Sequence, residues 1–62
     1  MRDPKRIDKF CAELAKLWHI VPDWRFGQLI CNVFGVYKGN VFFPEDDKLM
    51  EFMQNYFKDL KP

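Results

Sequence analysis

The chain has 62 residues, of which 48% are hydrophobic and 31% are charged, and its formal net charge at pH 7 is +1. This composition is too apolar and too evenly charged for a disordered chain, and the length allows a single domain over residues 1–62. A net charge so close to zero excludes a protein that binds nucleic acid or anionic membranes through its total charge alone.

Cysteine content and the first residues indicate the compartment. Cys11 and Cys31 are too few for a disulfide scaffold, and Met1–Arg6 leads straight into a charged helix rather than into a signal peptide. No apolar run approaches the roughly 20 residues that cross a bilayer. We therefore expect a cytoplasmic protein with two free thiols serving as small apolar side chains, no cofactor or metal, and no membrane partner.

The first predicted helix begins at Asp3-Pro4, because Asp can cap free backbone N–H groups and Pro at the first helical position loses no hydrogen bond. Apolar residues then recur at steps of three and four, which predicts a helix from about Pro4 to His19. The apolar stripe consists of Ile7, Phe10, Cys11, Leu14, Leu17 and Trp18.

The second predicted helix runs from Pro22 or Asp23 to Phe34, with Gly35 placed to end it in the left-handed conformation. Its inner side would carry Phe26, Leu29, Ile30 and Val33, and a flanking strip would carry Trp24, Gly27, Cys31 and Phe34. This helix is therefore apolar on more than one side. Either two neighbouring helices sandwich it, or part of it faces another molecule.

The segment Val36–Phe43 has two short β-prone runs around Gly39-Asn40, a dipeptide suited to a tight turn. It predicts a small hairpin that packs its aromatic residues on the helices, because an isolated hairpin is marginal in water.

The third predicted helix runs from about Asp46 to Leu60, with negative charge at its N-terminus where the helix dipole favours it. The expected fold is mainly α: a three-helix domain with a short β-hairpin or extended segment before the third helix. The core should consist of Ile7, Leu14, Leu17, Leu29, Ile30, Val33, Leu49, Met53 and Tyr56.

Candidate catalytic groups are nearly absent, since the chain has one His and neither Ser nor Thr. His19 falls at the end of the first helix, where a protonated imidazole meets the helix dipole favourably. Glu45, Asp46 and Asp47 suit a helix start better than a metal site. We therefore expect a protein that is not an enzyme.

The densest unusual stretch surrounds Trp24 and Arg25, because Trp and Arg are enriched in binding hot spots. The sequence predicts a protein interface, including self-association as a homodimer, on the flanking strip of the second helix. The interface would include Trp24, Cys31 and Phe34 of this strip, with Arg25 or Gln28 at its rim. Two alternatives stay open: Trp24 folds back over Trp18, or the segment Val36–Phe43 covers the strip.

A nucleic-acid-binding protein is the alternative function. Basic residues form a stripe along the first helix and could contact phosphates. These residues are Arg2, Lys5, Arg6, Lys9 and Lys16.

Several segments resemble a group of short bacterial and phage proteins of unassigned function. The group shares a Pro-Asp-x-Arg-x-Gly-Gln-Leu segment after a first helix that ends in Trp, and an acidic start to the last helix. The matching residues, between Arg6 and about Leu49, are Arg6-Ile7, Trp18, Pro22–Ile30, Asn32, Phe43, Asp46-Asp47 and Leu49. More distantly, the layout is similar to the YihD-like small bacterial proteins. The resemblance implies a small helical accessory protein, such as a phage or mobile-element inhibitor that binds and blocks a host defence protein.

Overall fold

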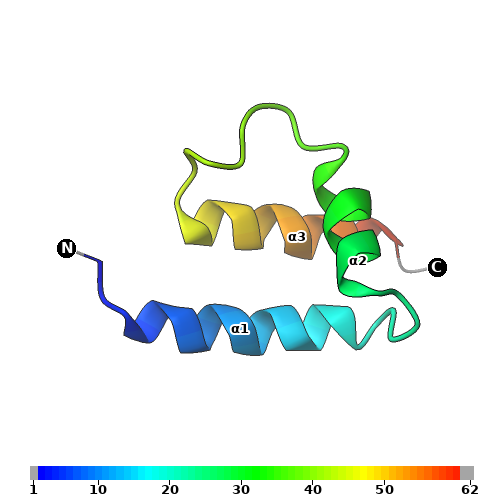
Figure 1. Ribbon diagram of the computed structural model, residues 1–62, viewed down its shortest axis with the longest axis horizontal. Coiled ribbons are helices and arrows are strands. Elements are labelled where there is room, and N and C mark those ends of the chain that lie inside the picture. The colour runs from blue at the N-terminus through cyan, green and yellow to red at the C-terminus, as the bar shows by residue number, and fades with distance from the viewer. Residues whose placement is uncertain (1, 61–62) are drawn as a thin grey trace.

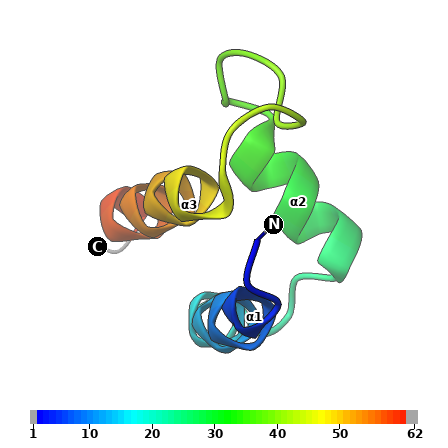
Figure 2. The same cartoon turned by 90° about the vertical axis from the view of Figure 1, so that its left-hand side faces the viewer.

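The computed structural model describes residues 2–60, which form three α-helices. They are α1 (Lys5–Trp18), α2 (Phe26–Phe34) and α3 (Asp46–Leu60). α1 and α3 run parallel with their N-termini at the same end of the molecule, and the shorter α2 crosses beside their C-terminal halves (Figure 1, Figure 2). Since α1 and α3 run parallel, α1 ends at one end of the molecule and α3 begins at the other. The loop 35–45 carries the chain from α2 back along α3 to the end where α3 begins (Figure 1).

The ends of α1 and α3 follow local signals, as predicted. The Asp3 carboxylate accepts a hydrogen bond from the Lys5 backbone N–H at 2.9 Å, which satisfies a free donor at the start of α1. The Glu45 carbonyl accepts the N–H groups of Lys48 and Leu49 at 3.0 and 3.2 Å, and the acidic residues 46 and 47 occupy the first turn of α3. The bounds of α3 agree with the prediction, and those of α1 differ by one residue at each end.

The start of α2 differs from the prediction, because this helix begins at Phe26 rather than at Pro22 or Asp23. The Trp18 indole N–H donates to the Trp24 carbonyl at 2.8 Å, which ties the preceding turn to α1. Arg25 is then extended, and its backbone N–H donates to the Gln28 side-chain oxygen at 2.7 Å. This contact is half of a capping box and fixes the first helical residue.

The predicted hairpin over Val36–Phe43 is wrong, since no strand forms within residues 2–60. The Asn40 side-chain oxygen accepts a hydrogen bond from the Phe42 backbone N–H at 2.8 Å and so forms a local turn. In a hairpin, that N–H group would be available to pair with the opposite strand. Gly39 adopts φ 110°, in the region that favours glycine. Gly35, predicted to be left-handed, instead continues the helical conformation with φ −63° and ψ −23°.

The core is small and lies where α2 covers the two long helices. Its buried residues are Leu29, Val33, Met50, Met53 and Phe57. The prediction is confirmed for three of these, Leu29, Val33 and Met53. It is wrong for Ile7, which is 52% exposed because α2 does not reach the N-terminal half of α1. The remaining predicted core residues are half-buried, namely Leu14, Leu17, Ile30, Leu49 and Tyr56.

Both cysteines are free thiols, and both are exposed. Cys11 belongs to the predicted apolar stripe of α1, yet its side chain is exposed. The expectation that the two thiols pack as small apolar side chains is therefore wrong.

Candidate protein-binding surface

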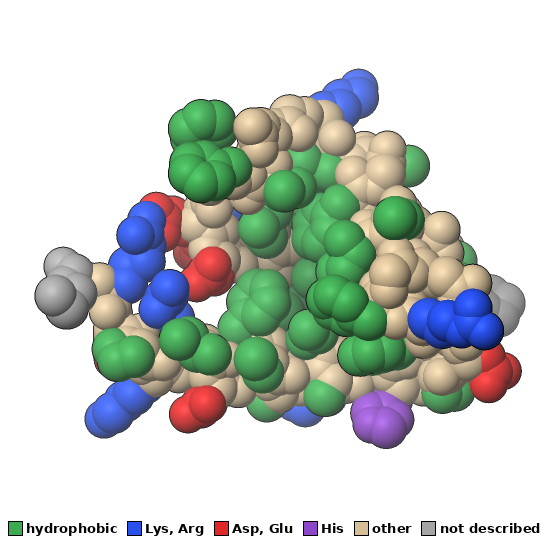
Figure 3. Space-filling model, viewed as in Figure 1, with side chains coloured by type: hydrophobic (Ala, Val, Ile, Leu, Met, Phe, Trp, Pro, Cys, Tyr) green, Lys and Arg blue, Asp and Glu red, His purple; other side chains and the backbone are tan. Residues whose placement is uncertain are grey.

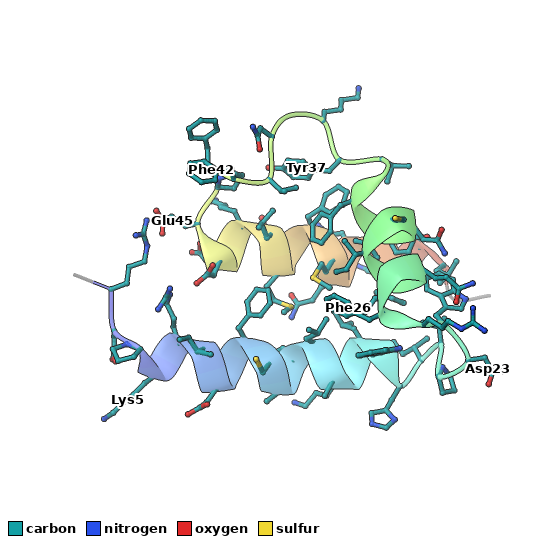
Figure 4. The ribbon with its side chains drawn as sticks, viewed as in Figure 1. Lys5, Asp23, Phe26, Tyr37, Phe42 and Glu45 are labelled. Carbon is teal, nitrogen blue, oxygen red and sulfur yellow. The ribbon has the colours of Figure 1, made fainter. Side chains whose placement is uncertain are left out.

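The two aromatic residues of the predicted interface, Trp24 and Phe34, are half-buried in the described structure. The Trp24 ring lies 6.2 Å from that of Phe57 in the core. Phe34 stacks on Phe52 of α3 at 5.9 Å, and Tyr37 from the loop meets Phe34 edge-on at 6.2 Å. Figure 4 shows Tyr37 between the loop and α3. The loop thus covers part of the strip, one of the two alternatives that the sequence left open.

The polar members of the predicted interface, Arg25 and Gln28, are exposed on α2, as is Cys31. The Gln28 side-chain oxygen is already engaged in the helix cap. Within the predicted interface, Trp24 and Phe34 are thus partly covered by neighbouring rings, and the other three members are exposed.

Phe42 and Phe43 are the most exposed large apolar residues of the described chain, at 80% and 75%. They lie in the loop just before α3, and their rings meet edge to face with centroids 5.0 Å apart. Phe42 projects away from the helices at the end where both long helices begin (Figure 4). We call this pair the aromatic tip. Two neighbouring exposed Phe rings form an apolar patch, a feature that protein interfaces often share.

The sequence contained a signal for this tip that the hairpin prediction obscured. Successive side chains of an extended segment point to opposite faces, so Phe42 and Phe43 cannot both pack on the helices from one strand. Pro44 follows directly and restricts Phe43 to extended conformations. Two adjacent Phe residues before a Pro therefore predict at least one exposed ring.

Two ion pairs join the N-terminal segment to the start of α3, beneath the aromatic tip. The Arg2 guanidinium donates two hydrogen bonds to the Glu45 carboxylate, at 2.8 and 2.6 Å. Arg6 donates to Asp46 at 2.7 Å. Figure 3 shows basic and acidic side chains gathered at this end of the molecule. We call these four residues the ion-pair cluster, which has no net charge.

These pairs change the electrostatics of the predicted basic stripe. Arg2 and Arg6 are matched by carboxylates, and Lys16 pairs with Glu13 at 3.4 Å. Lys5 and Lys9 are the two members without an ion pair to residues 2–60. Cations that bind phosphates must be free of carboxylate partners. The ion pairs of the structure therefore favour nucleic-acid binding less than the sequence alone did.

We predict a measurable pKa change at Glu45. The hydrogen bonds from Arg2, reinforced by its charge, hold the pKa of Glu45 below its ordinary value of 4.5. A lowered folded-state pKa stabilises the fold at neutral pH, and this contribution is lost as the pH falls below 4.5 through the folded-state pKa. Carboxyl-detected NMR titration should show the Glu45 pKa rising toward its ordinary value in Arg2→Gln. Arg25→Gln is the matched control, and an equal Glu45 pKa in wild type and Arg2→Gln would contradict the prediction.

A second feature lies beside the ion-pair cluster, between the N-terminal halves of α1 and α3. It is a space of about 380 Å³ whose apolar lining is Phe10 and Met50. We call it the interhelical slot. Its polar lining consists of Arg6, Lys9, Glu13, Asp46, Asp47, Glu51 and Gln54. Arg6 and Asp46 also line the depression of about 390 Å³ next to Phe42 and Phe43, so the tip and the slot adjoin each other.

Side chains that could bind a metal ion or act in catalysis do not gather in one place within residues 2–60. His19 is exposed beyond the end of α1, and no three metal-ligating side chains within residues 2–60 converge to hold an ion. None of the three helices is long and apolar enough to cross a membrane. Comparison of the chain with protein-family models, with curated proteins and with solved structures gives no match.

Proposed function

We propose that this chain is a small non-enzymatic protein-binding module whose contact surface is the aromatic tip with the neighbouring interhelical slot. The observation that carries the proposal is the 80% and 75% exposure of Phe42 and Phe43. Removing two aromatic rings from water on binding gives a large favourable free energy, and aromatic residues are enriched at interface centres.

The surroundings of the tip favour a protein partner over a phosphate-rich one. Arg2 and Arg6, the cations that line the depression beside the tip, are paired with Glu45 and Asp46. The partner therefore meets an apolar centre with a polar rim that carries charges of both signs, which is the anatomy of a protein interface. Inhibition of a larger protein machine is the form of this function that the family resemblance suggests.

Capture from the native host tests the proposal. Tagged wild-type protein should retain a partner through nuclease treatment and a high-salt wash, because apolar contacts are insensitive to salt whereas phosphate contacts weaken steeply. Phe42→Ser/Phe43→Ser should lose that partner. Val36→Ser, which replaces a 63%-exposed apolar residue elsewhere in the loop, should retain it.

Two outcomes would contradict the proposal. One is a partner retained equally by the double variant and by wild type. The other is capture that disappears with nuclease or salt and depends on Lys5 and Lys9, which would support the nucleic-acid alternative instead.

A further inference from the structure

We propose that the partner at this surface is a second copy of the chain, with the aromatic tip of each copy seated in the interhelical slot of the other. The inference rests on the proposed function, since it names the partner of the same surface. Four observations support it: the exposed area, the adjacency of tip and slot, the size of the slot, and the neutral cluster between them.

The molecule exposes more surface than a compact monomer of its mass. Its accessible surface is 5189 Å² for 7.5 kDa, whereas scaling for folded monomers gives about 4,200 Å². Its radius of gyration is 11.9 Å, against roughly 10.6 Å for a compact domain of this length. The excess surface, roughly 1,000 Å², is comparable with the roughly 800 Å² that each partner buries in a standard interface.

The positions of the tip and the slot allow a single two-fold rotation to form both contacts of a dimer. They lie on the two sides of Arg6 and Asp46, which line the slot as well as the depression beneath the tip. A two-fold axis through this ion pair carries the tip of each copy toward the slot of the other. Such an isologous contact closes after two copies, whereas a one-sided insertion would continue into a fibre.

The slot has the size and lining that an aromatic ring requires. A cavity of about 150 Å³ already takes up benzene, and the slot holds about 380 Å³ with Phe10 and Met50 on its apolar side. Thioether and aromatic groups both make favourable contacts with an inserted ring. The slot therefore accommodates Phe42 of the second copy, with Phe43 against the rim.

The charges around the proposed axis permit two copies to meet there. Arg2 and Arg6 are balanced by Glu45 and Asp46 within one copy. The four charges of each cluster cancel, and its pairs can exchange partners across the axis, while Asp3 and Asp47 beside the cluster add negative charge that salt screens. A cluster of one sign at this position would oppose self-association.

Sedimentation equilibrium over a range of protein concentration tests the dimer. At high micromolar concentration the wild-type mass should be twice 7.5 kDa. Phe42→Ser/Phe43→Ser, which removes the tip, and Glu51→Trp, which fills the slot from an exposed rim position, should each weaken dimerisation at least about tenfold. Val36→Ser is the matched control and should dimerise as wild type does.

Mixing the two impaired variants separates this geometry from general stickiness. In a mixed dimer the Glu51→Trp copy supplies an intact tip and the other copy supplies an intact slot, so one of the two contacts is restored. The mixture should therefore associate more strongly than either variant alone. A monomeric wild type, or a dimer unaffected by both variants, would overturn the inference.

The outcomes also distinguish this inference from the proposed function. A wild-type monomer that still captures a host partner through Phe42 and Phe43 keeps the function and rejects the second copy as the partner. In the opposite outcome, wild type dimerises, but Phe42→Ser/Phe43→Ser captures the same host partner as wild type. That result would support the dimer and contradict the proposal that the tip binds other proteins.

Discussion

Phe57→Ala should destabilise the domain by about 3–5 kcal/mol, the largest loss that we expect from one substitution. The Phe57 side chain is 1% exposed and lies beside the rings of Trp24 and Tyr56, at centroid distances of 6.2 and 5.4 Å. Truncation removes its buried surface and leaves a cavity that the neighbouring rings cannot fill. Domains of this length are stable by roughly 3–9 kcal/mol, so a large fraction of the variant should be unfolded at room temperature.

Phe42→Ala is the matched control, because it makes the same chemical change at a side chain that is 80% exposed. Its free energy of unfolding should stay within about 0.5 kcal/mol of wild type. Urea denaturation followed by circular dichroism, at low micromolar concentration where the monomer is measured, gives both values. Equal losses for the two variants would show that the core described here is wrong.

Leu29→Ala should cost about 2–5 kcal/mol in the same experiment. Leu29 is 0% exposed and lies on the short α2, so its side chain joins α2 to the other helices. Because α2 contributes only two fully buried residues, Leu29 and Val33, losing one of them should loosen the whole helix.

Ile7→Ala is the control for that variant, since the sequence assigned Ile7 and Leu29 alike to the core. Ile7 is 52% exposed, and its truncation should cost less than about 1 kcal/mol. Thermal melting ranks the two variants directly. A melting temperature of Leu29→Ala within a degree or two of wild type would contradict the packing of α2.

Local signals were enough to locate the two long helices. Asp3 supplies a cap one turn before the apolar stripe of α1, and the acidic residues 46 and 47 occupy the positive end of the α3 dipole. Both effects act within a few residues and need no distant partner. The predictions of these helices are therefore confirmed to within one residue.

The candidate site was less accessible to sequence reasoning. Trp24 and Phe34 have the composition of an interface, yet the rings of Phe57 and Phe52 pack against them. Phe42 and Phe43 were assigned to a hairpin and became the exposed tip. The composition shows that the chain has more apolar residues than a small core can bury. Which of them stay exposed depends on the path of the loop, which the sequence did not predict.

The sequence by itself determined a mainly helical fold, the bounds of α1 and α3, and the nearly empty catalytic inventory, because these depend on periodicity, capping and residue type. The tertiary structure decided the rest. The Trp18 indole fixed the turn before α2, the Asn40 side chain replaced a hairpin ladder with a local turn, and the parallel course of α1 and α3 brought Arg2 to Glu45. Each of these contacts either joins residues far apart in the chain or decides between two local structures of similar energy, and in both cases the outcome depends on the packing of the whole domain.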